Sequence, residues 1–135
     1  MNEQIGTFIT SYEVSTGDTG APTLKLNLVV TTPTKTVNGS AEVSQTINPP
    51  FNAHYEVSGD FTYMTVMPNN THIMVKLTGI SGPQFGLTNF KAYLVLNDDW
   101  SSGVCNFSYI NSNGEWNEIQ DARVTKVSAT EYQPA

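Results

Sequence analysis

The chain has 135 residues, a formal net charge of −6 and only six Lys and Arg residues. Nucleic acids and anionic membranes are bound through clustered positive charge, so this acidic balance argues against both as partners. A hydrophobic fraction of 39%, with 10% aromatic residues, argues against a disordered chain. The length fits one domain, which we expect over residues 1–127, followed by a loosely ordered tail over residues 128–135.

Alternation of apolar and polar side chains predicts strands through the first half of the chain. The clearest strand covers residues 22–32, where aliphatic side chains share one face. Strands are also expected over residues 6–15 and 34–47. Gly39 indicates that the last of these strands bends, or that another segment crosses it closely.

The densest run of large apolar side chains is GDFTYMTVMPNNTHIMVKLTG, residues 59–79. It is expected to form two strands joined at residues 68–70, because Pro fixes φ and Asn tolerates the left-handed conformation of a tight reversal. The preceding segment, residues 52–58, is expected to continue into the first of these strands with a bend at Gly59. The alternative is a hairpin turn at Gly59.

The strand expected over residues 61–67 is apolar on both faces, which fits a central strand packed on each side. It also fits a surface that contacts another protein, through Met64 and Val66 on this strand and Met74 on the next. The direction in which these three side chains point decides between the two interpretations.

The second half of the chain continues the pattern of short strands and polar turns. Gly and Pro mark a loop over residues 80–88, and Asn-Gly marks a hairpin turn at residues 111–114. Strands are expected over residues 90–96, 104–110 and 115–127. We find no helical period. An even number of consecutive antiparallel strands, about eight here, can close on itself and remove both sheet edges. We therefore predict an all-β domain, with an up-and-down barrel preferred to a β-sandwich.

Four segments resemble the sequence blocks of a small bacterial family catalogued as a domain of unknown function: GAPTLKLNLVVTTPTKTVNG, SQTINPP, GDFTYMTVMPNNTHIMVKLTG and LNDDWSSG. The resemblance spans residues 20–127, and its most specific part is YMTVMP. It implies a bacterial origin and a stand-alone domain. It carries over no activity, ligand or catalytic residue, so the functional argument depends on the side chains themselves.

Side chains suited to catalysis or metal binding are sparse. His54 and His72 are the two histidines, and neither lies in a nucleophile motif or at the spacing of a metal-binding pair. We therefore predict no catalytic residue, no metal and no cofactor. The adjacent Asp98 and Asp99 are interpreted as a solvated turn. Cys105 lies in an expected strand and is interpreted as a small buried hydrophobe.

Aromatic and amide side chains favour a binding role. Sugars are held by aromatic faces beside carboxylate and amide groups, and residues 97–100 and 111–117 have this composition. The candidate ligand-binding residues are Asp99, Trp100, Asn113 and Trp116. If the strands form a meander, the two segments lie at opposite ends of one strand, and the tryptophans then fit better as plugs of the barrel ends.

These observations predict a non-enzymatic module that binds a small ligand or a glycan. The first alternative is protein–protein interaction or homo-oligomerisation through residues 61–67, and the second is an enzyme that uses His72 inside a barrel cavity. A secretory signal and a membrane span are both missing from the sequence, which predicts a cytoplasmic location and leaves non-classical release open.

Overall fold

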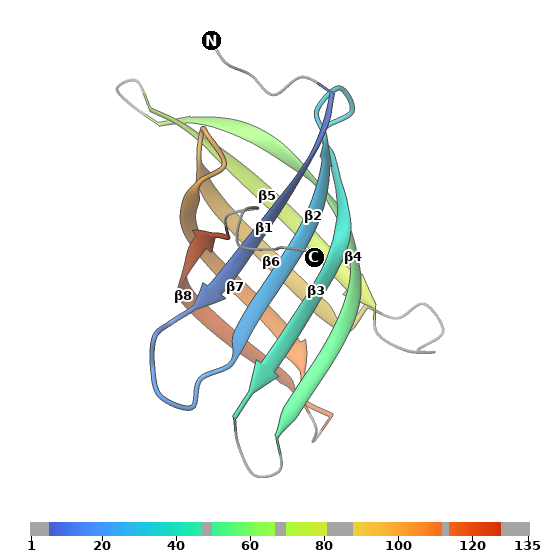
Figure 1. Cartoon of the computed structure of the whole chain (residues 1–135), viewed down its shortest axis with the longest axis vertical. Coiled ribbons are helices and arrows are strands. Elements are labelled where there is room, and N and C mark those ends of the chain that lie inside the picture. The colour runs from blue at the N-terminus through green and yellow to red at the C-terminus, as the bar shows by residue number, and fades with distance from the viewer. Residues whose placement is uncertain (1–5, 47–49, 67–69, 81–87, 112–113, 128–135) are drawn as a thin grey trace, which may run out of the picture.

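The computed structural model of the chain describes residues 6–46, 50–66, 70–80, 88–111 and 114–127. These residues form the strands β1 (Thr7–Ser15), β2 (Thr23–Thr31), β3 (Thr36–Gln45), β4 (Phe51–Val66), β5 (Asn70–Ile80), β6 (Phe90–Asn97), β7 (Ser102–Ile110) and β8 (Trp116–Lys126). Each strand pairs antiparallel with the next along the chain, and β8 pairs with β1, so the sheet closes into a barrel (Figure 1). The predicted all-β, up-and-down barrel is confirmed. No helix long and apolar enough to cross a membrane occurs in this part of the chain.

The prediction of one long strand through Gly59 is confirmed by β4, in which Gly59 pairs with Val37 on β3 and with Leu77 on β5. A Cβ atom on Gly59 would overlap the carbonyl oxygen of Lys76, so only glycine fits where the two backbones approach so closely. Gly39 is crowded in the same way by the backbone of β2. Of the two interpretations of Gly39, a bend or a close approach by another segment, the close approach is therefore confirmed, and that segment is the paired strand β2.

Several predicted connections lie outside the described residues. These are the tail over residues 128–135, most of the loop over residues 80–88 and part of the reversal at residues 68–70. The turn at residues 111–114 is described at both of its ends. The N–H of Gly114 donates to the carbonyl of Asn111 (2.9 Å), and β7 and β8 pair on either side, which confirms a hairpin there.

Side chains alternate between the inside and the outside of the barrel along the strands. The buried hydrophobic residues that make up the core are only 0–4% exposed. A cavity large enough for a ligand would leave exposed surface on its walls, so the interior lined by these residues is filled with side chains. The largest fully buried side chains are those of Tyr12, Phe61, Phe90, Phe107 and Tyr109.

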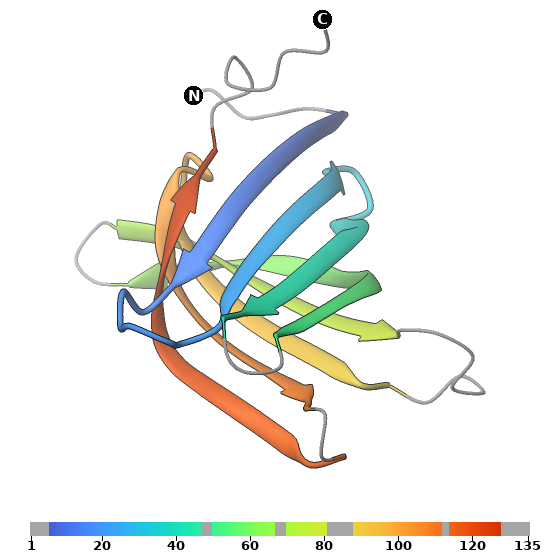
Figure 2. The same ribbon diagram turned by 60° about the horizontal axis from the view of Figure 1, so that its bottom comes forward.

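The last strand is bent where it separates from β1. Gln120 and Asp121 lie opposite the single residue Asn106 of β7, which makes a β-bulge. Asp121 has a φ of 60°, and its N–H donates to Oδ1 of Asn106 (2.8 Å). β8 pairs with β1 only from Arg123 to Lys126, and the half of β8 before the bulge runs on past the end of β1 (Figure 2).

Candidate functional site

The barrel has two ends at which side chains can meet a ligand. At the upper end in Figure 1, β2, β4 and β6 end and β3, β5 and β7 begin; at the lower end, β1, β3, β5 and β7 end and β2, β4, β6 and β8 begin. Because the described interior is filled, a candidate site lies at one of these ends or on the outer face.

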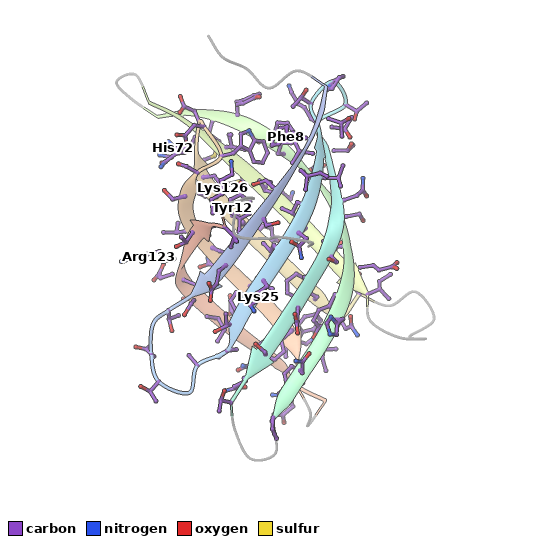
Figure 3. All side chains as sticks on the ribbon, in the orientation of Figure 1. Phe8, Tyr12, Lys25, His72, Arg123 and Lys126 are labelled. Carbon is purple, nitrogen blue, oxygen red and sulfur yellow. The ribbon has the colours of Figure 1, made fainter. Side chains whose placement is uncertain are left out.

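Trp100 closes the upper end. It lies between β6 and β7 with a φ of 64°, and its N–H donates to the carbonyl of Asn97 (2.9 Å). The indole ring packs edge-on against Phe8 and Phe61, with ring centroids 5.3 and 5.0 Å away, and only 3% of the residue is exposed. The hydroxyl of Tyr12, labelled with Phe8 in Figure 3, donates to the carbonyl of Trp100 at 2.7 Å. Trp100 is therefore a plug, and its ring is not free to stack on a ligand.

Asp99 serves the same turn as Trp100. Its carboxylate accepts the N–H of Ser101 (3.1 Å), and hydrogen bonding to Ser101 lowers the pKa of Asp99. Asp98 and Asp99 are both exposed, which fits the predicted solvated turn. The two candidate ligand residues at the upper end, Asp99 and Trp100, thus have a structural role in the turn and the plug.

Trp116 lies at the opposite end of β7 from Trp100, as expected for a meander. It begins β8 opposite Ile110, and 48% of it is exposed. Nζ of Lys91 lies 5.2 Å from the centroid of its ring, a cation–π contact. Asn113 lies outside the described residues. The structure therefore does not bring Trp100 and Trp116 into one site.

A cluster of polar and aromatic side chains lies at the lower end. Nδ2 of Asn117 donates to the hydroxyl of Tyr109 (2.8 Å), and that hydroxyl makes a longer contact of 3.5 Å with Oε1 of Gln45. The ring of Phe51 packs on the ring of Tyr109 with centroids 5.3 Å apart. These side chains come from β3, β4, β7 and β8, and we call them the lower-end cluster: Gln45, Phe51, Tyr109 and Asn117.

The lower-end cluster is partly open to solvent. Tyr109 is buried, whereas the other three residues of the cluster are partly exposed. Nε2 of Gln45 donates to the carbonyl of Gly20 (2.9 Å), which holds this amide against the β1–β2 connection. The Asn117 amide uses a donor on Tyr109, and its side-chain oxygen Oδ1 is an acceptor at this partly exposed position. A ligand at this end would meet an aromatic ring and an amide with hydrogen-bonding capacity left over.

Two titratable groups in the barrel interior are kept neutral by burial. Tyr55 stacks on Phe90 with ring centroids 4.9 Å apart, and burial, with a smaller effect of Tyr109, raises the pKa of Tyr55 to about 12. Burial also raises the pKa of the Cys105 thiol to about 12, and this residue is the small buried hydrophobe that was predicted. The lower-end cluster consists of amide, phenol and phenyl groups, so it can donate and accept hydrogen bonds and stack on a ligand.

Both histidines lie on the outer face of the barrel. His72 precedes the buried Ile73 in β5 and lies on the outer side of the sheet (Figure 3). Nε2 of His54 lies 3.7 Å from Oε2 of Glu42, in an exposed pair. Within the described ranges no group of three side chains could hold a metal ion. The enzyme alternative needs His72 inside a cavity, and the structure puts this side chain on the other side of the sheet.

Apolar side chains gather on the outer face of β4 to β7, in what we call the outer patch: Met64, Met74, Tyr93, Val95 and Val104. The register aligns Met74 with Val95, and Val95 with Val104. Tyr93 and Val104 are 49% and 51% exposed. Met64 and Met74, two of the three predicted contact residues, thus face outward, and the side chain of Val66 lies outside the described part.

Sequence reasoning missed the lower-end cluster as a site. Asn117 ends the segment 111–117 whose composition suggested sugar binding, so a signal existed for this residue. Gln45, Phe51 and Tyr109 carried no such signal, because they meet only after closure of the barrel brings β3 and β4 towards β7.

The model of a family described as a domain of unknown function (DUF1842) matches residues 5–116. The match covers β1 to β7 and reaches the first residue of β8. A search of curated proteins finds none that is similar to the chain.

Proposed function

The chain belongs to this family of unknown function, and from the side chains of the site we propose that it is a non-enzymatic module that binds an uncharged glycan at the lower-end cluster. One observation carries the proposal. The partly exposed ring of Phe51 packs on Tyr109, whose hydroxyl accepts a hydrogen bond from the partly exposed amide of Asn117.

This combination matches what sugars require. The C–H face of a sugar ring packs on an aromatic face, while its hydroxyls need groups that both donate and accept hydrogen bonds. The amides of Gln45 and Asn117 can do both, and both residues are partly exposed at the lower end. The mouth of a β-barrel is also a common place for such sites.

An uncharged ligand is favoured over a charged one. The lower-end cluster offers amide, hydroxyl and phenyl groups but no ion to pair with a charged ligand. The chain as a whole carries a net charge of −6, and Glu115 and Glu118 flank Asn117 in sequence and are exposed. Both features disfavour an anionic ligand.

Glycan-array screening, followed by calorimetric titration with the strongest neutral ligand, tests the proposal. Asn117→Ala removes the amide and Phe51→Leu removes the aromatic face. Each is expected to weaken binding about tenfold, because one lost hydrogen bond or stacking contact is worth about 1.4 kcal/mol. Asn52→Ala is the matched control, since Asn52 follows Phe51 on the exposed outer face of the same strand.

Two results would overturn this assignment. One is the failure of any neutral glycan to bind, and the other is unchanged affinity in both Asn117→Ala and Phe51→Leu. Loss of binding in Trp116→Ala with full binding in Asn117→Ala would move the site to the outer face of the barrel.

The outer patch supports a second candidate, a contact between copies of this chain. Its members are contiguous on the sheet, and Tyr93 and Val104 are each about half exposed. Exposed apolar side chains that adjoin one another are typical of interaction surfaces. Light scattering over a range of concentrations tests the idea with Val104→Lys as the variant. A strict monomer at all concentrations would remove this candidate.

A further inference from the structure

Among the described residues, the first half of β8 has an edge on which no strand pairs, and we call this edge free. β8 pairs with β7 from Trp116 onward, but its pairing with β1 begins only at Arg123. In the described part of the chain no other strand pairs with residues 116–120 (Figure 2). A free sheet edge presents unpaired backbone N–H and C=O groups on which another strand can pair.

The hydrogen-bond pattern shows which backbone groups face this edge. In an antiparallel ladder, residue pairs that exchange hydrogen bonds alternate with pairs that do not. The N–H of Asn111 donates to the carbonyl of Glu115 (2.8 Å), so the next bonded positions on β8 are Asn117 and Ile119. The residues that alternate with these bonded positions, Trp116, Glu118 and Gln120, direct both backbone groups away from β7, towards the edge.

The bulge separates this edge from β1, and the local charges limit which strands can pair on it. The extra residue at Asp121 bends β8 and separates residues 116–120 from the direction of β1. Natural proteins often protect an edge with charged side chains, proline or a bulge; residues 116–120 contain no proline but carry Glu118, so a strand that pairs here must offset its negative charge. Three acidic residues in or beside this segment are exposed, Glu115, Glu118 and Asp121, against one nearby cation, Lys91 over the ring of Trp116.

We propose that residues 116–120 of β8 bind an extended peptide of a partner protein as an added strand, and that this peptide carries basic side chains at alternate positions. Main-chain hydrogen bonds to a sheet edge supply affinity, and alternate side chains supply specificity. Opposite charges facing each other across two strands are stabilising. A Lys or Arg opposite Glu118, with further basic residues near Glu115 and Asp121, matches the acidic surroundings.

A second copy of this chain fits the edge less well. Antiparallel pairing of two copies over residues 116–120 sets Glu118 directly opposite its own copy, and like charges in that position are destabilising. The added strand is also independent of the glycan site, because it uses backbone groups of β8 whereas the glycan site uses the Asn117 side chain.

Amide hydrogen exchange, followed by NMR, tests the proposal. The probe is a short peptide of alternating Lys and Val, and the control peptide has Glu in place of Lys. The amides of Trp116, Glu118 and Gln120 are expected to exchange fast in the free protein and about tenfold more slowly with saturating Lys peptide. No slowing with the Lys peptide overturns the proposal, and equal slowing by both peptides overturns the basic requirement. Slowing that grows with protein concentration alone would assign the edge to a second copy.

Glu118→Pro tests the edge directly. Proline removes an N–H that faces the edge and that the ladder with β7 does not use, so the barrel should fold while peptide binding is lost. Glu118→Thr is the matched control, since it keeps the N–H and should lose only part of the affinity. Binding retained in a folded Glu118→Pro protein overturns the proposal. Should this variant not fold, a Lys–Val peptide with N-methylated backbone amides tests the same point, because it must fail to bind the unaltered protein.

Discussion

Replacing Trp100 by Ala tests whether the upper end of the barrel needs its plug. The change removes a side chain that is 3% exposed and ends its edge-on contacts with Phe8 and Phe61. Truncating a buried aromatic residue costs about 3–5 kcal/mol, through the lost transfer free energy and the cavity left behind. The hydrogen bond from Tyr12 goes to the Trp100 backbone, so the substitution does not remove its acceptor. We expect the free energy of unfolding to fall by about 4 kcal/mol.

The backbone conformation of Trp100 sharpens this prediction. A φ of 64° lies in the left-handed region, where glycine carries no steric penalty and alanine carries about 1 kcal/mol. Trp100→Gly should therefore be about 1 kcal/mol more stable than Trp100→Ala, although it leaves the larger cavity. The reverse order would mean that the cavity outweighs the backbone strain.

Guanidinium unfolding of the unaltered protein, Trp100→Ala and Trp100→Gly measures these stability differences as shifts of the unfolding midpoint at an unchanged m-value. Trp116→Ala is the matched control, because Trp116 is 48% exposed and its loss should cost less than about 1 kcal/mol. A cost below about 1 kcal/mol for Trp100→Ala, together with loss of glycan binding, would refute the plug and make Trp100 a ligand residue.

Two further predictions concern the close strand crossing and the buried hydroxyls. Gly59→Ala sets a methyl group against the backbone of Lys76 and should destabilise the barrel by about 2 kcal/mol or more. Gly17→Ala is the control, because Gly17 lies in open space with a φ of 85° and its replacement should cost only about 1 kcal/mol. Equal losses of unfolding free energy in Gly17→Ala and Gly59→Ala would contradict the close approach of the two backbones at Gly59. Burial raises the pKa of both Tyr12 and Tyr55 to about 12. Their contribution to stability is thus fully present below about pH 10 and is lost as the pH rises through 12, so the thermal midpoint should fall over that window. The thermal midpoint of Tyr12→Phe should fall less steeply with pH than that of the unaltered protein. Identical pH profiles would argue that ionisation of Tyr12 does not cause the loss of stability.

The strands were predictable because each one repeats a local pattern. The alternation in residues 22–32 predicts both β2 and its buried face, and Gly39 signals a close crossing through its missing side chain. The strand expected over residues 34–47 is shorter in the structure, where β3 runs from Thr36 to Gln45 and Lys35 adopts a φ of 57° before it. Local pattern thus locates an element better than it locates the ends of that element.

The site was less predictable because its residues are joined by closure of the sheet. Gln45 and Tyr109 meet across the barrel, and no spacing along the chain reports that contact. Trp100 was a candidate ligand residue and also a candidate plug. Its burial follows from a left-handed backbone, which tryptophan adopts rarely and for which the sequence has no marker. Asp121, in the bulge of β8, is another non-glycine residue with a left-handed backbone, so the sequence does not signal this bulge either.

The short ladder between β1 and β8 has a consequence for folding. Every other pairing in the barrel joins consecutive strands, so seven hairpin-like contacts can form by local zipping of an open meander. The seam from Tyr12 to Ser15 joins Arg123 to Lys126 from the far end of the sequence, and its loop-closure entropy is the largest in the molecule. We expect this seam to form last and to open first, so that the rate of its opening sets how often the packed interior is exposed to water.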